Sequence, residues 1–351
     1  MKELLIEKNI LRRNYSRVRQ EAGDAKILAV LKNNAYGLGL LPMARFWREM
    51  GVTRFGIGDL ADAAALRAEG FQQEELLLMR STCIPEEIEL LLDYQVIATI
   101  GSQEAAVALS GLAEKRGTIA EAHIEIDCGM GRYGFLPEEI DKVKAVYEYM
   151  NALAISGVYT HIPPGMSQKK ALAAKAAFDG VLDKIRAAGL ETGTTHAFGS
   201  AALFAYDDLQ SYDMVRIGAA IGGRIPGKTG LGQVGVIIAP ITDIRWIPPG
   251  HTISKTVRLR KPARIGFLPV GYAAGFMVFP PKRMRFWQML ASRAYRAPSV
   301  RLETGEEVKV LGHVGQNHIA VDLTNAKCTA GALARIEVDP LFAGDLPREV
   351  R

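Results

Sequence analysis

A lysine follows directly on an apolar run near the start of the chain. The run Ile27–Leu31 has the length of a buried strand, and Lys32 opens a loop with two asparagines, a tyrosine and two glycines between residues 33 and 39. Alone, such a lysine is typical of a strand end that turns into solvent. The helical pattern at 41–50 favours a second interpretation, because α/β enzymes place reactive groups on loops at strand ends. Lys32 is therefore a candidate reactive group.

Other predicted strand ends carry groups that suit an anion. These are the segment Asp127–Arg132, His161, the run His196–Ser200, Arg216 and Gly218. Backbone N–H groups in glycine-containing loops, with the hydroxyls of Ser200 and Tyr36, suit a phosphate. Neighbouring arginines would disfavour the ammonium form of Lys32 and favour Schiff-base chemistry. If these strand ends converge, the sequence predicts an anion pocket with a reactive lysine.

The elements that would position these groups are short strands alternating with helices. The strand candidates are Lys26–Leu31, Phe55–Ile57, Glu75–Met79, Val96–Ile100, Ala122–Ile126, Ile155–Thr160, Thr192–His196 and Met214–Ile217, and helical patterns lie at 9–21, 41–50, 60–69, 85–93, 103–115, 137–149, 168–188 and 201–206. Parallel neighbours need a crossover, so the alternation predicts a (β/α)8 TIM barrel, whose strand C-terminal ends share one face. A doubly wound open sheet is the alternative.

The sequence pattern changes after Gly222, where short runs of β-branched residues replace the helical spacing of apolar residues. These runs are Val234–Ile238, Thr252–Val257, Arg264–Pro269, Glu307–Leu311, Ile319–Asp322 and Ala334–Glu337. The sequence therefore predicts an α/β barrel over residues 9–222 and a C-terminal all-β domain over 223–351. An apolar-polar alternation at 1–8 predicts a strand that joins this β domain.

The interval from Phe276 to Pro298 carries five cations and no acid, interleaved with aromatic residues. Such a segment can bind nucleic acid, a membrane surface or a partner subunit. The simpler interpretation is an amphipathic surface helix with Met284, Trp287 and Leu290 turned inward.

Composition describes an ordinary globular protein. Apolar residues make up 48% and charged residues 23% of the 351 residues. The net charge of +5 is too small for this length to indicate nucleic-acid binding. We expect no membrane span, no secretory signal and a cytoplasmic location. The three cysteines, Cys83, Cys128 and Cys328, have no CxxC spacing, so neither disulfides nor a metal site is expected.

Six segments resemble motifs of the alanine racemases, fold type III enzymes that use pyridoxal 5′-phosphate. Val30–Gly39 resembles the cofactor-lysine motif, and Asp127–Phe135 resembles D-T-G-M-x-R-x-G-F. The others are Gly157–His161, similar to G-x-x-T-H; Ser200–Ala202, similar to part of N-S-A-A; Asp213–Gly218, similar to D-M-V-R-x-G; and Leu268–Ala273, similar to the catalytic-tyrosine segment. They occur in the family's order and cover nearly the whole chain, which makes the resemblance specific.

The resemblance implies an amino-acid racemase with two catalytic bases. Lys32 would hold the cofactor and act on one face of the substrate α-carbon, and Tyr272 would act on the opposite face. In this family the tyrosine comes from the partner subunit, so a homodimer is implied. No nucleic-acid or membrane partner is implied.

The resemblance also assigns cofactor contacts. Arg216 would face the pyridine nitrogen and keep it unprotonated, and His161 would lie near Tyr272 and Arg216. Arg132 would reach the cofactor's phenolic oxygen and the substrate carboxylate. The phosphate would be held by Tyr36, Ser200 and the backbone of Gly218 and Ala219.

The chain departs from the family pattern at several positions. Glu125 stands where many members carry a carbamylated lysine, and it would supply the same negative charge beside Arg132. Gly199 replaces an asparagine, Ala274 replaces an aspartate, and Gln316 becomes the residue that lines the substrate side chain. No tyrosine follows Tyr295, so the family's C-terminal phosphate-binding tyrosine is absent. Most departures fall in the second domain, so the resemblance implies alanine or a related, more polar amino acid as the substrate.

Two alternatives remain open. One is a cofactor-binding carrier or regulator without racemase turnover. The other is a different fold type III enzyme, such as a decarboxylase or an aldolase.

Overall fold

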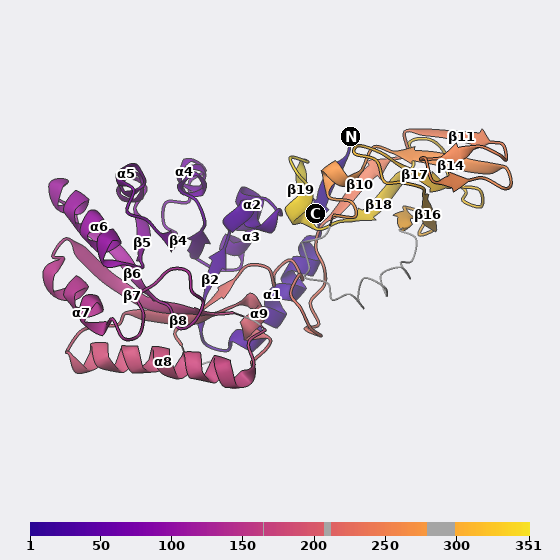
Figure 1. The fold of residues 1–351 in the computed structure, drawn as a ribbon. Helices are drawn as coiled ribbons and strands as arrows, with labels where there is room; N and C mark the ends of the chain where they lie inside the picture. Colours follow the sequence, from indigo (N-terminus) through magenta and orange to yellow (C-terminus); the bar gives the residue numbers. More distant parts are fainter. Residues whose placement is uncertain (164, 207–211, 279–298) are drawn as a thin grey trace. The chain divides into compact units, whose positions relative to one another are not determined.

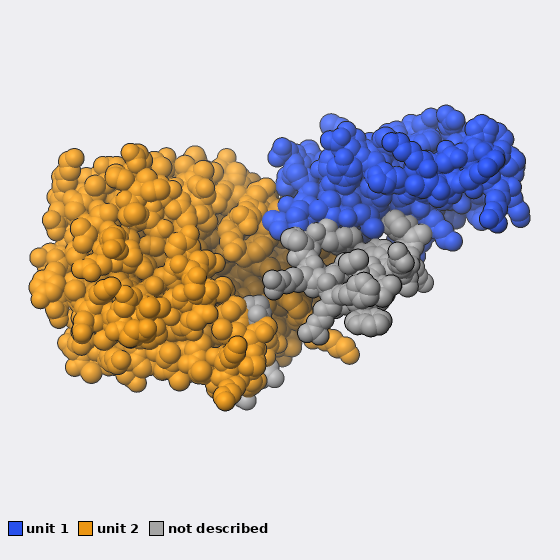
Figure 2. Space-filling model, in the orientation of Figure 1, with its two compact units in different colours: residues 1–9, 234–351 blue, residues 10–233 orange. Residues whose placement is uncertain are grey.

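The structure is a computed structural model that describes residues 1–163, 165–206, 212–278 and 299–351. The chain folds into two compact units. The barrel unit comprises Ile10–Gln233, and the β unit comprises Met1–Asn9 together with Val234–Arg351 (Figure 2).

Eight parallel strands close into a barrel in the barrel unit (Figure 1). They are β2 (Lys26–Val30), β3 (Arg54–Ile57), β4 (Glu75–Ser81), β5 (Val96–Ile100), β6 (Ala120–Ile126), β7 (Leu153–Ile162), β8 (Thr194–Gly199) and β9 (Met214–Ile217). The barrel closes where β9 pairs with β2, with Lys26 opposite Met214. This confirms the predicted TIM barrel and excludes the open sheet.

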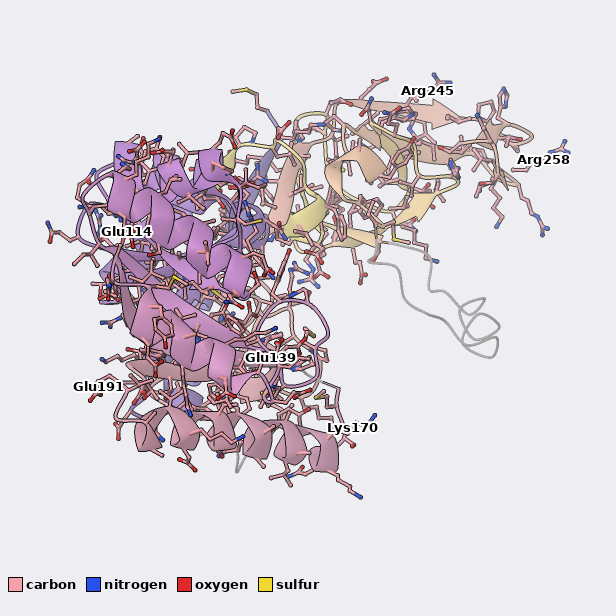
Figure 3. All side chains as sticks on the ribbon, turned by 60° about the vertical axis from the view of Figure 1, so that its left-hand side comes forward. Glu114, Glu139, Lys170, Glu191, Arg245 and Arg258 are labelled. Carbon is pink, nitrogen blue, oxygen red and sulfur yellow. The ribbon has the colours of Figure 1, made fainter. Side chains whose placement is uncertain are left out.

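Helices cover the outside of the barrel (Figure 1). They are α1 (Lys8–Ala22), α2 (Lys32–Tyr36), α3 (Leu40–Glu49), α4 (Leu60–Ala68), α5 (Pro85–Asp93), α6 (Gln103–Lys115), α7 (Ile140–Tyr149), α8 (Gln168–Ala187) and the short α9 (Ser200–Leu203). Three of them begin at side-chain caps, in which Asp59, Ser102 and Ser167 accept backbone N–H groups. Charged side chains such as Glu114 and Lys170 project from the helices into solvent (Figure 3).

The division between the units falls after Gln233, whereas the sequence pattern predicted it after residue 222. The segment in between belongs with the barrel because it is tied to α1. The buried Asn14 side chain donates to the carbonyls of Gly232 and Ile221 and accepts from the Gly232 N–H. Two of these three hydrogen bonds reach Gly232 and hold this segment on the barrel.

The β unit is built on a nine-stranded sheet of order β11-β14-β17-β16-β15-β18-β10-β1-β19. Its strands are β1 (Glu3–Ile6), β10 (Val236–Pro240), β11 (Asp243–Ile247), β14 (Ala263–Leu268), β15 (Ser299–Leu302), β16 (Glu307–Leu311), β17 (Ile319–Asp322), β18 (Leu333–Glu337) and β19 (Arg348–Val350). The N-terminal strand β1 pairs antiparallel with β10 and parallel with β19. The chain start is therefore part of this sheet.

The predicted strand Thr252–Val257 is instead a small hairpin of β12 (Thr252–Ile253) and β13 (Val257–Arg258). Ser254 and Lys255, between these strands, have positive φ and turn the chain. Two 3-10 turns, η1 (Tyr272–Ala274) and η3 (Pro340–Phe342), also belong to the β unit. Residues 279–298, most of the basic-aromatic segment, lie outside the described residues.

Candidate active site

A cavity of about 720 Å³ opens at the C-terminal ends of the barrel strands. Its lining includes eight of the residues predicted from the sequence: Lys32, Tyr36, Glu125, Arg132, His161, Ser200, Arg216 and Ala219. Gly218 lies beside this lining, since its N–H donates to Ser200 Oγ at 2.8 Å. The barrel therefore brings together the strand-end groups whose convergence was the condition for an anion pocket.

Lys32 opens a helical turn of left-handed backbone rather than the predicted loop. Residues 33–36 all have positive φ, between 51° and 56°. Left-handed helix costs roughly 1–2 kcal/mol for each ordinary residue, although asparagine tolerates it better. Ala35 and Tyr36 have no such tolerance, so backbone strain is concentrated at this site. No residue pattern signalled the turn, because only glycine and asparagine commonly indicate positive φ.

The turn aims the Tyr36 ring at Gly218. A Cβ atom at Gly218 would lie only 2.3 Å from Cε2 and 2.5 Å from the hydroxyl of Tyr36. Position 218 therefore admits only glycine while the ring keeps this place. Burial raises the pKa of Tyr36 to about 12, so its hydroxyl remains a hydrogen-bond donor at neutral pH. Tyr36, Ser200 and the Gly218 backbone form a compact set of polar groups beside Lys32.

The Lys32 amine is disposed to lose its proton. Burial lowers its pKa, and the charges of Arg132 and Arg216 lower it further. Gly58 packs closely against the lysine stem, because a Cβ there would lie 3.0 Å from Lys32 Cβ. A half-buried lysine with a lowered pKa can act as a nucleophile and as a base.

Arg132 is held by a loop organised around one carboxylate. Asp127 Oδ1 accepts the N–H groups of Gly129 and Met130 at 2.9 and 2.6 Å, and Oδ2 accepts that of Arg132 at 3.0 Å. The loop closes tightly, since a Cβ at Gly134 would lie 2.7 Å from the Asp127 nitrogen. Asp127 therefore fixes the backbone from which the exposed Arg132 side chain reaches the cavity wall.

Arg216 is fully buried at the base of the cavity. One guanidinium nitrogen donates to His196 Nδ1 at 2.7 Å, and the other donates to His161 Nδ1 at 3.0 Å and to the carbonyls of Thr160 and Ala197. Burial lowers its pKa to about 10, which leaves it charged at neutral pH. Burial and the Arg216 charge lower the pKa of His161 to about 3. His161 is therefore a neutral acceptor for Arg216.

Glu125 lies in the barrel interior, 4% exposed. Its Oε2 atom has no hydrogen-bond partner among the described residues. Burial raises the pKa of this carboxyl to about 7, although Arg216 and Arg132 oppose the rise. The carboxyl is thus poised between its neutral and charged forms near neutral pH.

Three residues of the barrel interior near Glu125 and Arg216 were not identified from the sequence: Thr99, His123 and Tyr159. Tyr159 stacks on His196 with ring centroids 4.6 Å apart and shares a hydrogen bond of 3.0 Å with Thr99, and His123 Nδ1 lies 3.0 Å from His196 Nε2. A signal was available, because side chains two apart on a strand share a face. His123 precedes Glu125 by two positions and Tyr159 precedes His161 by two.

Tyr272 and Gln316 lie together in the β unit. The N–H groups of Tyr272 and Ala273 donate to the carbonyls of Gly315 and Gln316, both at 3.1 Å. The approach depends on Gly271, where a Cβ would lie 2.1 Å from the Gly315 oxygen. The Tyr272 side chain is 50% exposed. The β unit therefore presents this tyrosine and this glutamine from one pair of adjoining backbone segments.

Within the described part of the chain, no group of three or more histidine, cysteine, aspartate or glutamate side chains is placed to hold a metal ion. Nor does any described helix have the length and apolar character needed to cross a membrane.

The fold and the cavity define a class: a TIM-barrel enzyme with a C-terminal β domain and a lysine-centred, cation-lined pocket. The profile of the alanine racemase N-terminal domain matches residues 6–226. The alanine racemase of Desulforamulus reducens is 30% identical over 356 residues, covering 97% of this chain and 89% of the relative. The chain belongs to the alanine racemase family, and it is a racemase, an isomerase.

Solved structures show the same fold. The alanine racemase of Clostridium difficile superposes with a TM-score of 0.83 at 24% identity, covering 99% of this chain and 88% of that one. The alanine racemase of Bartonella henselae, described with covalently bound pyridoxal phosphate, superposes with a TM-score of 0.80 at 22% identity, covering 100% of this chain and 99% of that one.

Proposed function

We propose that this protein is a pyridoxal 5′-phosphate-dependent racemase of alanine or a related amino acid, with Lys32 and Tyr272 as its two bases. The observation that carries the proposal is Lys32 itself. It stands at a strand end of a racemase-family barrel, with a lowered pKa, inside a cavity lined by arginines and phenol and hydroxyl groups.

The residues of the cavity fit the cofactor. A pyridoxal phosphate needs an amine for its aldehyde, donors for a phosphate and a group for its ring nitrogen. Lys32 supplies the amine; Tyr36, Ser200 and the Gly218 backbone lie together as phosphate donors. Arg216, whose guanidinium is fixed by hydrogen bonds to two histidine rings and to backbone carbonyls, would be the partner of the ring nitrogen. When bound, the cofactor would stabilise the negative charge that forms on the α-carbon when its proton leaves.

Racemisation requires one group that removes the α-proton on one face and another that returns it on the opposite face. Burial and the neighbouring arginines lower the pKa of Lys32, which favours its Nζ as the group that takes the proton on one face. The exposed phenol of Tyr272 is the second base. Because Arg216 cannot accept a hydrogen bond, it would leave a ring nitrogen placed beside it unprotonated. That restraint favours racemisation over decarboxylation, which supports the racemase over the other fold type III enzymes.

We propose that Tyr272 reaches the site from a second copy of the chain, so that the enzyme works as a homodimer. Gln316, which adjoins the Tyr272 backbone, would then line the substrate side chain. A small cofactor carrier would need neither the β unit nor this tyrosine, so their presence favours the enzyme.

The racemase proposal is tested by the loss of α-deuterium from labelled amino acids and by chiral analysis of the products, across the proteinogenic amino acids and ornithine. We expect exchange in the wild type and none in Lys32→Ala, which should also lose the cofactor's visible absorbance. Lys26→Ala is the matched control, because Lys26 is an exposed lysine at the other end of the same strand. Protein that binds no cofactor on reconstitution would refute the proposal.

Tyr272→Phe should retain the cofactor and lose racemisation, whereas Tyr149→Phe, at an exposed tyrosine of the barrel unit, should retain both. The shared site is tested by mixing inactive Lys32→Ala with inactive Tyr272→Phe under conditions that exchange subunits. A shared site restores about a quarter of the active sites at random pairing. Mixing that restores no activity would contradict a site completed by a second copy.

A further inference from the structure

A line of hydrogen bonds runs through the barrel interior below Arg216. The arginine donates to His196 Nδ1 at 2.7 Å, and His196 Nε2 lies 3.0 Å from His123 Nδ1. His196 is 0% exposed and His123 5% exposed. Three side chains on β9, β8 and β6 are thus joined across the barrel.

The donors and acceptors along this line have only one consistent arrangement. A guanidinium has donors and no acceptor, so His196 Nδ1 must accept from Arg216. A neutral His196 then carries its proton on Nε2 and donates it to His123 Nδ1. His123 in turn carries its own proton on Nε2. Both rings are neutral, because burial and the Arg216 charge lower the pKa of His196 and bring that of His123 to about 4.

The line ends at a second cavity, of about 130 Å³, at the opposite end of the barrel. His123 lines it, together with Ser156 and with residues at or near strand N-terminal ends, such as Arg54 and Glu121. The volume suffices for a few water molecules. Ser156 Oγ is buried without a hydrogen-bond partner among the described residues. The His123 Nε2–H therefore has polar surroundings in which to donate.

The barrel also makes room for the His123 ring. A Cβ at Gly157 of β7 would lie 2.6 Å from Cε1 and 2.7 Å from Nε2 of His123, and 2.7 Å from the Thr194 carbonyl. Any larger residue at 157 would displace the ring and with it the hydrogen bond to His196.

We propose that His123 is a positioning residue for the reaction, which fixes the tautomer of His196 and so keeps Arg216 in place beneath the active-site cavity. Without an acceptor at His123, His196 has two poor choices. In one tautomer its buried Nε2–H has no hydrogen-bond acceptor. In the other the proton lies on Nδ1, so two donors, the Nδ1–H and the N–H of Arg216, point at each other. Either state weakens the shortest hydrogen bond of Arg216, a buried cation with no ion pair among the described residues. The consequence for catalysis rests on the proposed function.

The tautomers can be measured directly, without any activity. Long-range nitrogen–proton NMR on protein labelled at its six histidines, assigned with single-histidine variants, distinguishes the two neutral forms. We expect His123 and His196 to carry their protons on Nε2 and to stay neutral from pH 8 down to pH 5. A proton on Nδ1 of either ring would overturn the inference, whether or not the protein is a racemase.

The catalytic role is tested in the holoenzyme with two variants. His123→Leu fills the space but removes the acceptor, and we expect kcat to fall about tenfold, the effect of one lost hydrogen bond, with little change in KM. His123→Asn returns an oxygen near the place of Nδ1 and should recover kcat to within about threefold. The bound cofactor's absorbance should shift in the leucine variant and return in the asparagine variant.

Thr195→Val is the matched control. Thr195 is buried on the same strand as His196, and its hydroxyl donates to Asp213 at 2.7 Å, outside the histidine line. This variant loses a buried hydrogen bond of similar kind and should keep kcat and the absorbance. Equal effects of His123→Leu and Thr195→Val would mean that His123 contributes only stability, and would overturn the positioning role. If His123→Leu does not fold, the NMR measurement of the tautomers and the kinetics of His123→Asn still test the positioning role.

Discussion

The buried Glu125 makes the stability of the barrel depend on pH in a direction that can be predicted. Glu125→Gln keeps the shape of the side chain and removes its charge. Burial favours the protonated form of this carboxyl, because a low-dielectric interior disfavours its charge, although Arg216 and Arg132 oppose the effect.

The magnitude follows from the pKa. A rise from 4.5 to about 7, caused first by burial, corresponds to about 3 kcal/mol at about 1.4 kcal/mol for each unit. Below pH 4.5 the carboxyl is neutral in both the folded and the unfolded chain. Between pH 4.5 and 7 the unfolded chain ionises while the folded chain holds its proton, so the free energy of unfolding falls as pH rises, and above pH 7 the loss is complete.

Urea unfolding, followed by the helical circular dichroism signal, measures this effect at several pH values. Between pH 5 and pH 8 the wild-type protein should lose about 2 to 3 kcal/mol of stability relative to Glu125→Gln. Glu121→Gln is the control, since Glu121 is an exposed carboxylate on the same strand and its replacement leaves the barrel interior unchanged. A Glu125→Gln difference that is constant over this range would refute a carboxyl that holds its proton in the folded barrel.

Three further changes test the site. Gly218→Ala should leave the fold intact but weaken cofactor binding more than tenfold, because its methyl group would displace the Tyr36 ring; a cofactor titration measures this. Asp127→Ala removes the acceptor of three backbone N–H groups and should raise KM for the amino acid through Arg132, with a smaller change in kcat from steady-state kinetics. Gly271→Ala should lower kcat without changing cofactor affinity, since it disturbs only the β-unit backbone that presents Tyr272; unchanged kcat would argue against that role.

Much of the fold could be predicted because parallel strands leave a strong pattern. Runs such as Val96–Ile100 are buried at every position, and their alternation with helical spacing admits few topologies. The boundary at 222 was misplaced because residues 223–233 lack helical spacing and resemble the β domain in pattern. Their place on the barrel depends on hydrogen bonds from Asn14, more than 200 positions away, which no local pattern reveals.

The candidate site likewise contains some features that the sequence could predict and others that it could not. Residues at strand ends, such as Lys32 and Arg216, could be found because the barrel gathers strand ends on one face. The left-handed turn could not, because Ala35 and Tyr36 adopt positive φ only where the surrounding structure compensates the strain. The proposed approach of Tyr272 to Lys32 joins residues about 240 positions apart on separate units, which no local sequence pattern reveals.

The barrel interior has an electrostatic consequence of its own. Arg216 is charged and fully buried, and it is balanced by carbonyls and neutral imidazoles rather than by a carboxylate within hydrogen-bonding distance in the described chain. Glu125, the nearby carboxyl, holds its proton to about pH 7 and so supplies only part of a counter-charge. Arg132 adds further positive charge at the cavity wall. Such an interior gains stability when an anion enters, because buried charges interact strongly in a low dielectric. A dianionic phosphate and a substrate carboxylate would each supply the charge that Glu125 withholds. Burial thus raises the pKa of Glu125 and should also favour anions in the cavity, so we expect Glu125→Gln to change the affinity of the cavity for anions.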